Sequence, residues 1–138
     1  MARTFHLQII TPERMFLDQE VEMLTLKAPD GEIGIQAGHA PAVVSTMEGE
    51  VRIFAGGRWR MAAGSDGTAT VTPEHVLLML QTCEWPEEID ENLARQNEER
   101  AKEILRQKGS MQEYVLAKSM LSRAMVRLRV LRNAPKND

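Results

Sequence analysis

The chain has 138 residues, enough for one or two small domains with a buried core and short for a multistep enzyme. Hydrophobic residues make up 43% and charged residues 27%, the balance of a globular protein rather than a disordered or fibrous one. No run of about 18 apolar residues occurs, so we expect no direct membrane insertion. The single cysteine, Cys83, excludes an internal disulfide, and we expect a reducing compartment and no metal site.

Charge is distributed unevenly along the chain. Residues 1–84 hold 6 basic and 11 acidic side chains, whereas residues 85–138 hold 11 basic and 9 acidic ones. From Arg106 onward, 8 basic side chains stand against only Glu113 and Asp138. A segment this positive predicts an acidic surface as its partner.

The first part of the chain is typical of a β-sandwich. Phe5, Leu7 and Ile9 alternate with more polar residues, as in a strand with one buried face. Gly56 and Gly57 are a strong hairpin signal. Further predicted strands cover residues 21–28, 34–36, 42–47, 51–55, 59–62, 68–72 and 76–81. Many short strands without helices between them favour an antiparallel β-sandwich, or a flattened barrel, over residues 1–84.

The period changes after Trp85 and Pro86. Residues then recur at helical spacing among dense charges: Ile89, Leu93, Asn97, Ala101, Ile104 and Leu105. Gly109 predicts a left-handed end of this helix, and Ser110 with Glu113 predicts a capping box that begins a second helix. The fold class is therefore predicted as α+β, with an N-terminal antiparallel β-sandwich over 1–84 and a C-terminal two-helix antiparallel hairpin over 85–138.

The second predicted helix has a seam and a charged side. Its seam has the spacing of an antiparallel helix pair: Ala117, Leu121, Ala124, Leu128 and Leu131. Four arginines lie off the seam and are expected to remain available to another surface: Arg123, Arg127, Arg129 and Arg132.

Catalytic motifs are missing from the sequence. Glu48 and Glu50 flank a glycine beside a strand, where exposed turn carboxylates are the preferred interpretation and acid–base catalysis is the alternative. No G-x-S-x-G, Walker A or G-x-G-x-x-G motif occurs, and Cys83 has no nearby histidine. His39 is interpreted as a structural loop histidine, with a switch or ligand role as the alternative. The sequence predicts a binding protein and not an enzyme.

The basic second helix raises nucleic-acid binding as a rival hypothesis, because clustered arginines neutralise phosphates. Aromatic residues make up only 4% of the chain, and Trp85 and Tyr114 both lie outside the arginine cluster. Since stacking residues and a base-reading motif are missing, we expect no nucleic acid among the partners.

Four short segments carry a family resemblance. They are Thr11-Pro12-Glu13, PDGEIGI at 29–35, GHAP at 38–41 and RAMVRLRV at 123–130. In order, spacing and total length the chain resembles the epsilon subunit of bacterial-type F-type ATP synthase. The resemblance implies a non-catalytic central-stalk rotor subunit of a proton-translocating ATP synthase. Such a subunit couples proton flow to ATP synthesis, and its hairpin inhibits ATP hydrolysis.

The same resemblance implies partners and a location. The sandwich would bind the gamma subunit and the membrane rotor ring of c subunits, with Glu32 and His39 at the matching contact loops. In the inhibited state the four arginines would contact the alpha and beta subunits, whose acidic surface supplies the predicted partner. The chain would lie peripherally at the cytoplasmic face of the bacterial cell membrane.

A nucleotide-sensing motif of that family, I-D-x-x-R-A, aligns with residues 89–94, where Leu93 stands in place of the motif arginine. The resemblance would place nucleotide contacts at Glu84, Ile89, Asp90, Ala94, Arg100, Arg123 and Arg127. Asp90 as a helix cap and Glu84 as an exposed strand end are the alternative interpretations. Arg95 lies about 200° around the helix from Leu93 and is a poor substitute. We expect no cofactor, with weak regulatory ATP binding as the alternative and a free-standing nucleotide-sensing regulator as the rival function.

Overall fold

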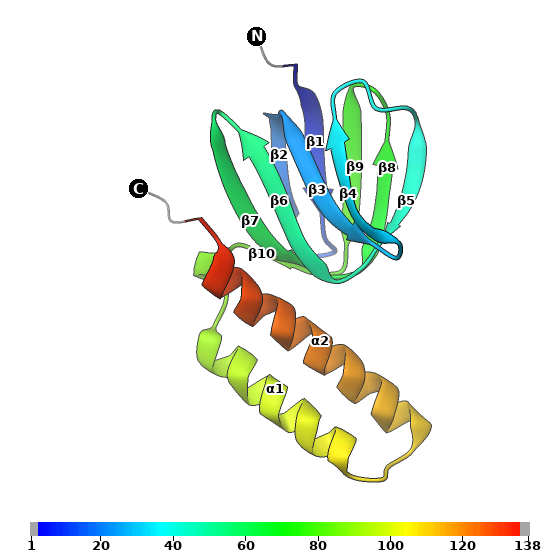
Figure 1. The fold of residues 1–138 in the computed structure, drawn as a ribbon, viewed down its shortest axis with the longest axis vertical. Coiled ribbons are helices and arrows are strands. Elements are labelled where there is room, and N and C mark those ends of the chain that lie inside the picture. Colours follow the sequence, from blue (N-terminus) through cyan, green and yellow to red (C-terminus); the bar gives the residue numbers. More distant parts are fainter. Residues whose placement is uncertain (1–2, 136–138) are drawn as a thin grey trace.

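The computed structural model describes residues 3–135, which form ten strands, a short 3-10 helix and two α-helices (Figure 1). The 3-10 helix spans Pro86–Glu88, and the α-helices are α1 (Glu91–Arg106) and α2 (Met111–Asn133). The strands are β1 (Phe5–Ile10), β2 (Met15–Val21), β3 (Met23–Ala28), β4 (Gly31–Gln36), β5 (Ala42–Thr46), β6 (Gly49–Ala55), β7 (Arg58–Gly64), β8 (Gly67–Val71), β9 (His75–Leu80) and β10 (Cys83–Glu84).

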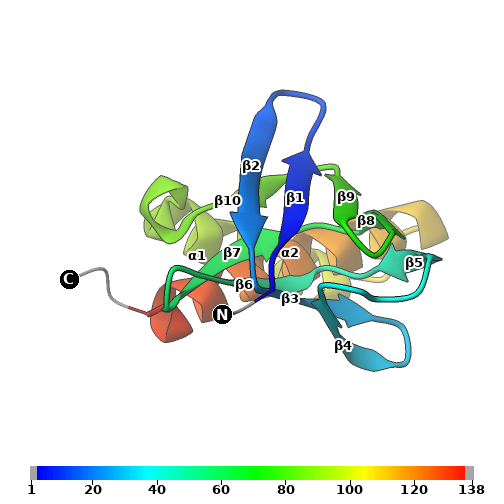
Figure 2. The same cartoon turned by 90° about the horizontal axis from the view of Figure 1, so that it is seen from above.

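The strands form two sheets of five, in the orders β2-β1-β9-β8-β5 and β10-β7-β6-β3-β4. Their inner faces meet in one core, whose fully buried side chains include Leu7, Leu24, Ile35, Ile53 and Leu78. Figure 2 looks down on this sandwich, with both helices behind it. The predicted fold class, a sandwich followed by a helical hairpin, is confirmed.

Local strand signals are confirmed where they rest on alternation or on a turn. Phe5, Leu7 and Ile9 of β1 are buried, and the residues between them are half-exposed. The β6–β7 hairpin turns at Gly56 and Gly57, with φ values of 59° and 75° that favour glycine.

Three predictions about the strands were wrong. No strand was predicted at Met15–Val21, and the strand predicted at 21–28 is broken at Glu22, where β2 ends and β3 begins. Strand β2 lies at a sheet edge and buries few side chains, so its apolar signal is weak. The sandwich is also not wholly antiparallel, because β1 pairs with β9 in parallel. A pairing between strands so distant in sequence leaves no local signature.

Both helices begin at polar caps. The Asp90 carboxylate accepts from the Leu93 amide at 3.0 Å, so α1 begins at Glu91 and Ile89 lies before the helix instead of within it. The Ser110 hydroxyl accepts from the Glu113 amide at 3.1 Å, which confirms the predicted N-cap of α2. The predicted left-handed stop at Gly109 was wrong, because α1 ends at Arg106, its C-cap residue Gln107 is extended, and Gly109 has no positive φ.

The helices pack against each other through small residues. Ala94 and Ala101 of α1 and Ala117 and Ala124 of α2 are all buried, which confirms the alanines of the predicted seam. The seam leucines are only half-buried, and Leu128 and Leu131 line an open groove of about 560 Å³ between the helices. Within residues 3–135, neither helix combines the length and the apolar character that a membrane crossing requires.

Candidate functional site

Helix α2 lies between α1 and the sandwich, against the outer face of the sheet that contains β6 and β7 (Figure 1). Val126 and Val130 of α2 pack on Met61 and Ala63 of β7 and on Ile89 beside the 3-10 helix. Residues four apart share one face of a helix, and alternate residues of a strand share one face of a sheet. The two valines of α2 therefore face the two outward residues of β7. Val130 is 0% exposed and Val126 is 4% exposed. We call this set of five side chains the apolar docking strip.

Three arginines of α2 flank this strip and pair with glutamates of the sandwich. Arg127 Nε lies 2.5 Å from Glu84 Oε1. Arg123 Nε lies 3.5 Å from Glu48 Oε1, and Arg129 Nε lies 3.5 Å from Glu50 Oε1. Three of the four off-seam arginines, predicted to be available to another surface, therefore already engage one in this docked form, the sandwich of the same chain. The fourth, Arg132, is exposed and makes no ion pair within the described residues.

The glutamates at these contacts are covered by the helix. The side chains of Glu48 and Glu50 are 15% and 14% exposed, so their interpretation as exposed turn carboxylates was wrong. Within the described residues, Glu48 Oε2 and Arg123 Nε are buried and have no hydrogen-bond partner. The ion pair between Glu48 and Arg123 is therefore loose as well as desolvated. Glu84 is likewise not a free strand end, because it accepts a hydrogen bond from Arg127.

The connection between sandwich and helices is held by contacts that sequence patterns did not indicate. Arg14, in the β1–β2 turn, donates to Glu88 at 2.8 Å and to the Cys83 carbonyl at 3.4 Å. The bond from Arg14 holds the pKa of Glu88 below its usual value. Trp85 stacks on Phe16 and lies under the Arg60 guanidinium, whose carbon is 3.7 Å from the ring centre. The root of the hairpin is thus fixed to both sheets.

Of the residues matched to the family's nucleotide contacts, three line one pocket, a small hollow between β7 and α2: Glu84, Arg123 and Arg127. The others lie elsewhere. Ile89 is in the apolar docking strip, Asp90 caps α1, and Ala94 is buried between the helices. Glu84 is brought together with Arg127, whereas Arg100 is exposed further along α1. The side chain of Leu93, at the position of the motif arginine, is exposed.

The two loop residues matched to rotor contacts lie near opposite ends of β4. Glu32 is at the start of the strand, is exposed, and accepts from Arg52 at 3.4 Å. His39 follows the strand, and its Nδ1 donates to the Ala40 carbonyl at 2.7 Å. The structure therefore does not bring Glu32 and His39 into one site.

Family models match both parts of the architecture. Residues 4–86 match the beta-sandwich domain of the ATP synthase delta/epsilon chain, and residues 87–132 match the long alpha-helix domain of the same chain. The chain belongs to the ATP synthase delta/epsilon chain family. The resemblance drawn from GEIGI and GHAP is confirmed.

Curated relatives within this family match along nearly the whole chain. An ATP synthase epsilon chain from Ruminiclostridium cellulolyticum is 43% identical over 125 residues, which cover 91% of this chain and 93% of the relative. One from Caldicellulosiruptor saccharolyticus is 41% identical over 134 residues, covering 97% and 98%. The chain is thus a non-catalytic subunit of the ATP synthase epsilon type.

Solved structures share the fold of this family member. A chain of the Euglena gracilis mitochondrial ATP synthase superimposes with a TM-score of 0.82 at 21% identity, covering 93% of this chain and 81% of that one. A chain of the Tetrahymena thermophila mitochondrial ATP synthase central stalk and c-ring gives a TM-score of 0.62 at 13% identity, covering 94% and 98%.

Proposed function

We propose that this chain is a central-stalk rotor subunit of a bacterial proton-translocating ATP synthase, and that its hairpin inhibits ATP hydrolysis. The epsilon chains it matches and the fold it shares with central-stalk chains support this assignment. Its sandwich would bind the gamma subunit and the rotor ring, at the cytoplasmic face of the membrane. The alpha and beta subunits would be partners only in the inhibited state, and no cofactor is needed.

One observation carries the inhibitory part of the proposal: the arginines proposed to contact the alpha and beta subunits already hold glutamates of the sandwich. Arg123, Arg127 and Arg129 cannot pair with Glu48, Glu84 and Glu50 and with an acidic partner surface at the same time. Docking on the sandwich and engagement of the catalytic subunits are therefore alternatives. The docked form is the non-inhibiting one.

The docked state is held by a modest free energy. Val126 and Val130 contribute about 1.5 to 3 kcal/mol each if burial is complete, and partly exposed ion pairs add about 0 to 1 kcal/mol each. Docking is thus worth several kcal/mol. A partner that prefers the released hairpin by about 5.5 kcal/mol would convert a population of 1:99 into 99:1.

The test uses the assembled ATP synthase and changes the sandwich side of the ion pairs. Glu84→Gln removes the 2.5 Å pair with Arg127 and leaves every arginine intact for the catalytic subunits. We expect ATP hydrolysis to fall, because the hairpin is released more often. Glu74→Gln is the matched control, since Glu74 makes no ion pair among residues 3–135. Hydrolysis that is equal in the two variants would contradict the competition between docking and inhibition.

A second variant tests the arginines themselves. Changing Arg123, Arg127, Arg129 and Arg132 together to alanine should raise hydrolysis with assembly unchanged, because the released hairpin no longer binds the acidic surface. If only removal of residues 110–138 raises hydrolysis, inhibition resides in the bulk of the hairpin and the electrostatic mechanism is rejected.

A further inference from the structure

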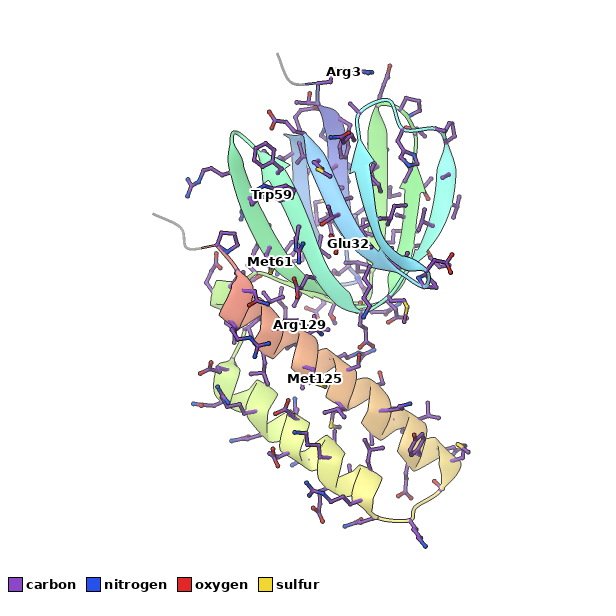
Figure 3. The ribbon with its side chains drawn as sticks, in the orientation of Figure 1. Arg3, Glu32, Trp59, Met61, Met125 and Arg129 are labelled. Atoms are coloured by element: carbon purple, nitrogen blue, oxygen red, sulfur yellow. The ribbon has the colours of Figure 1, made fainter. Side chains whose placement is uncertain are left out.

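A row of alternating charges crosses the outer face of the sheet from β4 to α2. Arg52 Nη1 donates to Glu32 at 3.4 Å, and Arg52 Nη2 donates to Glu50 Oε2 at 2.9 Å. The other oxygen of Glu50 lies 3.5 Å from Arg129 Nε. Figure 3 labels the two ends of this row, Glu32 on β4 and Arg129 on α2. We call Glu32, Arg52, Glu50 and Arg129 the charge row.

Strand register explains why these side chains meet. Glu50 and Arg52 alternate with Val51 and Ile53, which are buried in the core, so both charged side chains face outward. Arg52 stands opposite Thr25 of β3, and the next outward residue of β3, Lys27, stands opposite Glu32. The long Arg52 side chain therefore reaches across β3 to Glu32 on β4.

The two ends of the row differ in exposure. The side chain of Glu32 is 56% exposed and accessible to another molecule, whereas Glu50 is covered by α2. Both carboxylates act on Arg52: the hydrogen bond to Glu50 is the main cause that raises the pKa of Arg52, and the charge of Glu32 adds to it. Arg52 thus connects an open surface to the helix contact.

We propose that Arg52 couples occupancy of the Glu32 surface to release of helix α2. A cationic side chain of a partner that engages Glu32 removes the negative charge that balances Arg52. Arg52 then draws Glu50 away from Arg129 and repels the Arg129 guanidinium, so the hairpin is held less tightly. By linkage, a released hairpin changes the affinity of the Glu32 surface by the same factor. The coupling rests on the proposed function only for the identity of the partner, a rotor component.

The experiment measures docking in the intact chain, without the rest of the complex. Ala63→Cys places a thiol beneath Val126 and Val130, where Ala63 is 5% exposed, so its labelling rate follows the undocked population. All charge variants are compared in this background. Glu32→Gln should raise the rate about two- to fivefold, the range expected for one exposed ion pair. Glu32→Lys, which mimics an engaged cation, should raise it further.

Two controls separate the charge row from net charge. Asp30→Asn removes the same charge from the turn just before β4, and Lys27→Gln changes the residue opposite Glu32; neither residue makes an ion pair in the part of the chain described. Neither variant should reproduce the effect of Glu32→Gln. In an Arg52→Gln background, Glu32→Gln should no longer change the rate, because the connecting guanidinium is gone.

Each result decides the proposal. A Glu32→Gln rate equal to that of Asp30→Asn, or an effect that persists with Arg52→Gln, overturns it. Circular dichroism confirms folding of each variant, and the changed side chains of Glu32 and Asp30 are on the surface. Because hydrolysis is not measured, failure here leaves the inhibitory function standing, and failure of that function leaves this coupling testable.

Discussion

Truncation of the two valines in the apolar docking strip should release the hairpin from the sandwich without destabilising helix α2. Val126→Ala with Val130→Ala removes two methyl groups at each of two sites that are at most 4% exposed. At about 0.8 kcal/mol for each buried methyl-sized group, the double variant loses about 3 kcal/mol of docking free energy. Since 1.4 kcal/mol is tenfold, the ratio of docked to undocked chain should fall roughly 100-fold. Alanine favours the helix more than valine does, so α2 itself remains intact.

The Met61 methyl resonance in the isolated chain reports this change, because Met61 packs against the helix in the docked form and is 7% exposed. The matched control is Val115→Ala, the same substitution on the same helix at a site that is 56% exposed. We expect the resonance to move in the double variant only, and hydrolysis by the assembled ATP synthase to fall. A Met61 resonance unchanged from that of Val115→Ala would show that the strip does not hold the hairpin.

Three further predictions concern single residues. Burial raises the pKa of the Cys83 thiol to about 12, so a thiol reagent at about pH 8 should label the denatured chain and spare the native one. Hydrogen bonds to Glu20 and Asp18 raise the pKa of His6, so its contribution to stability is present below its unfolded pKa of about 6.5 and is lost as pH rises through the higher folded value. Denaturant midpoints should show a penalty for His6→Ala that is larger at about pH 5.5 than at about pH 9; equal penalties would refute the ion pairs. Calorimetry should detect no saturable ATP binding at micromolar concentrations, and Leu93→Arg should raise the affinity for ATP. Tight binding by the unaltered chain would show that another group replaces the motif arginine.

Local patterns in the sequence were sufficient wherever one short segment decides its own structure. The alternation around Phe5, the glycine pair at 56–57 and the Ser110 cap all act within a few residues. The same is true of Asp90, whose interpretation as a helix cap is confirmed by its bond to the Leu93 amide. The prediction for Gly109 was wrong because the extended C-cap residue Gln107 closes α1 without a left-handed residue.

The sequence by itself determined the order of sandwich and hairpin, most of their elements and the family, because alternation, helical spacing and turn residues are properties of neighbouring positions. It missed the edge strand β2 and the parallel pairing of β1 with β9. Only the tertiary structure decided where the arginines of α2 go. Arg127 and Glu84 are 43 residues apart, and the partners Glu48 and Glu50 show in the sequence only as acidic residues beside a strand. A charged side chain looks the same in a sequence whether water or a helix covers it. Because α2 docks on Met61 and Ala63, its arginines lie next to Glu48, Glu50 and Glu84, which form the acidic surface predicted for the basic helix.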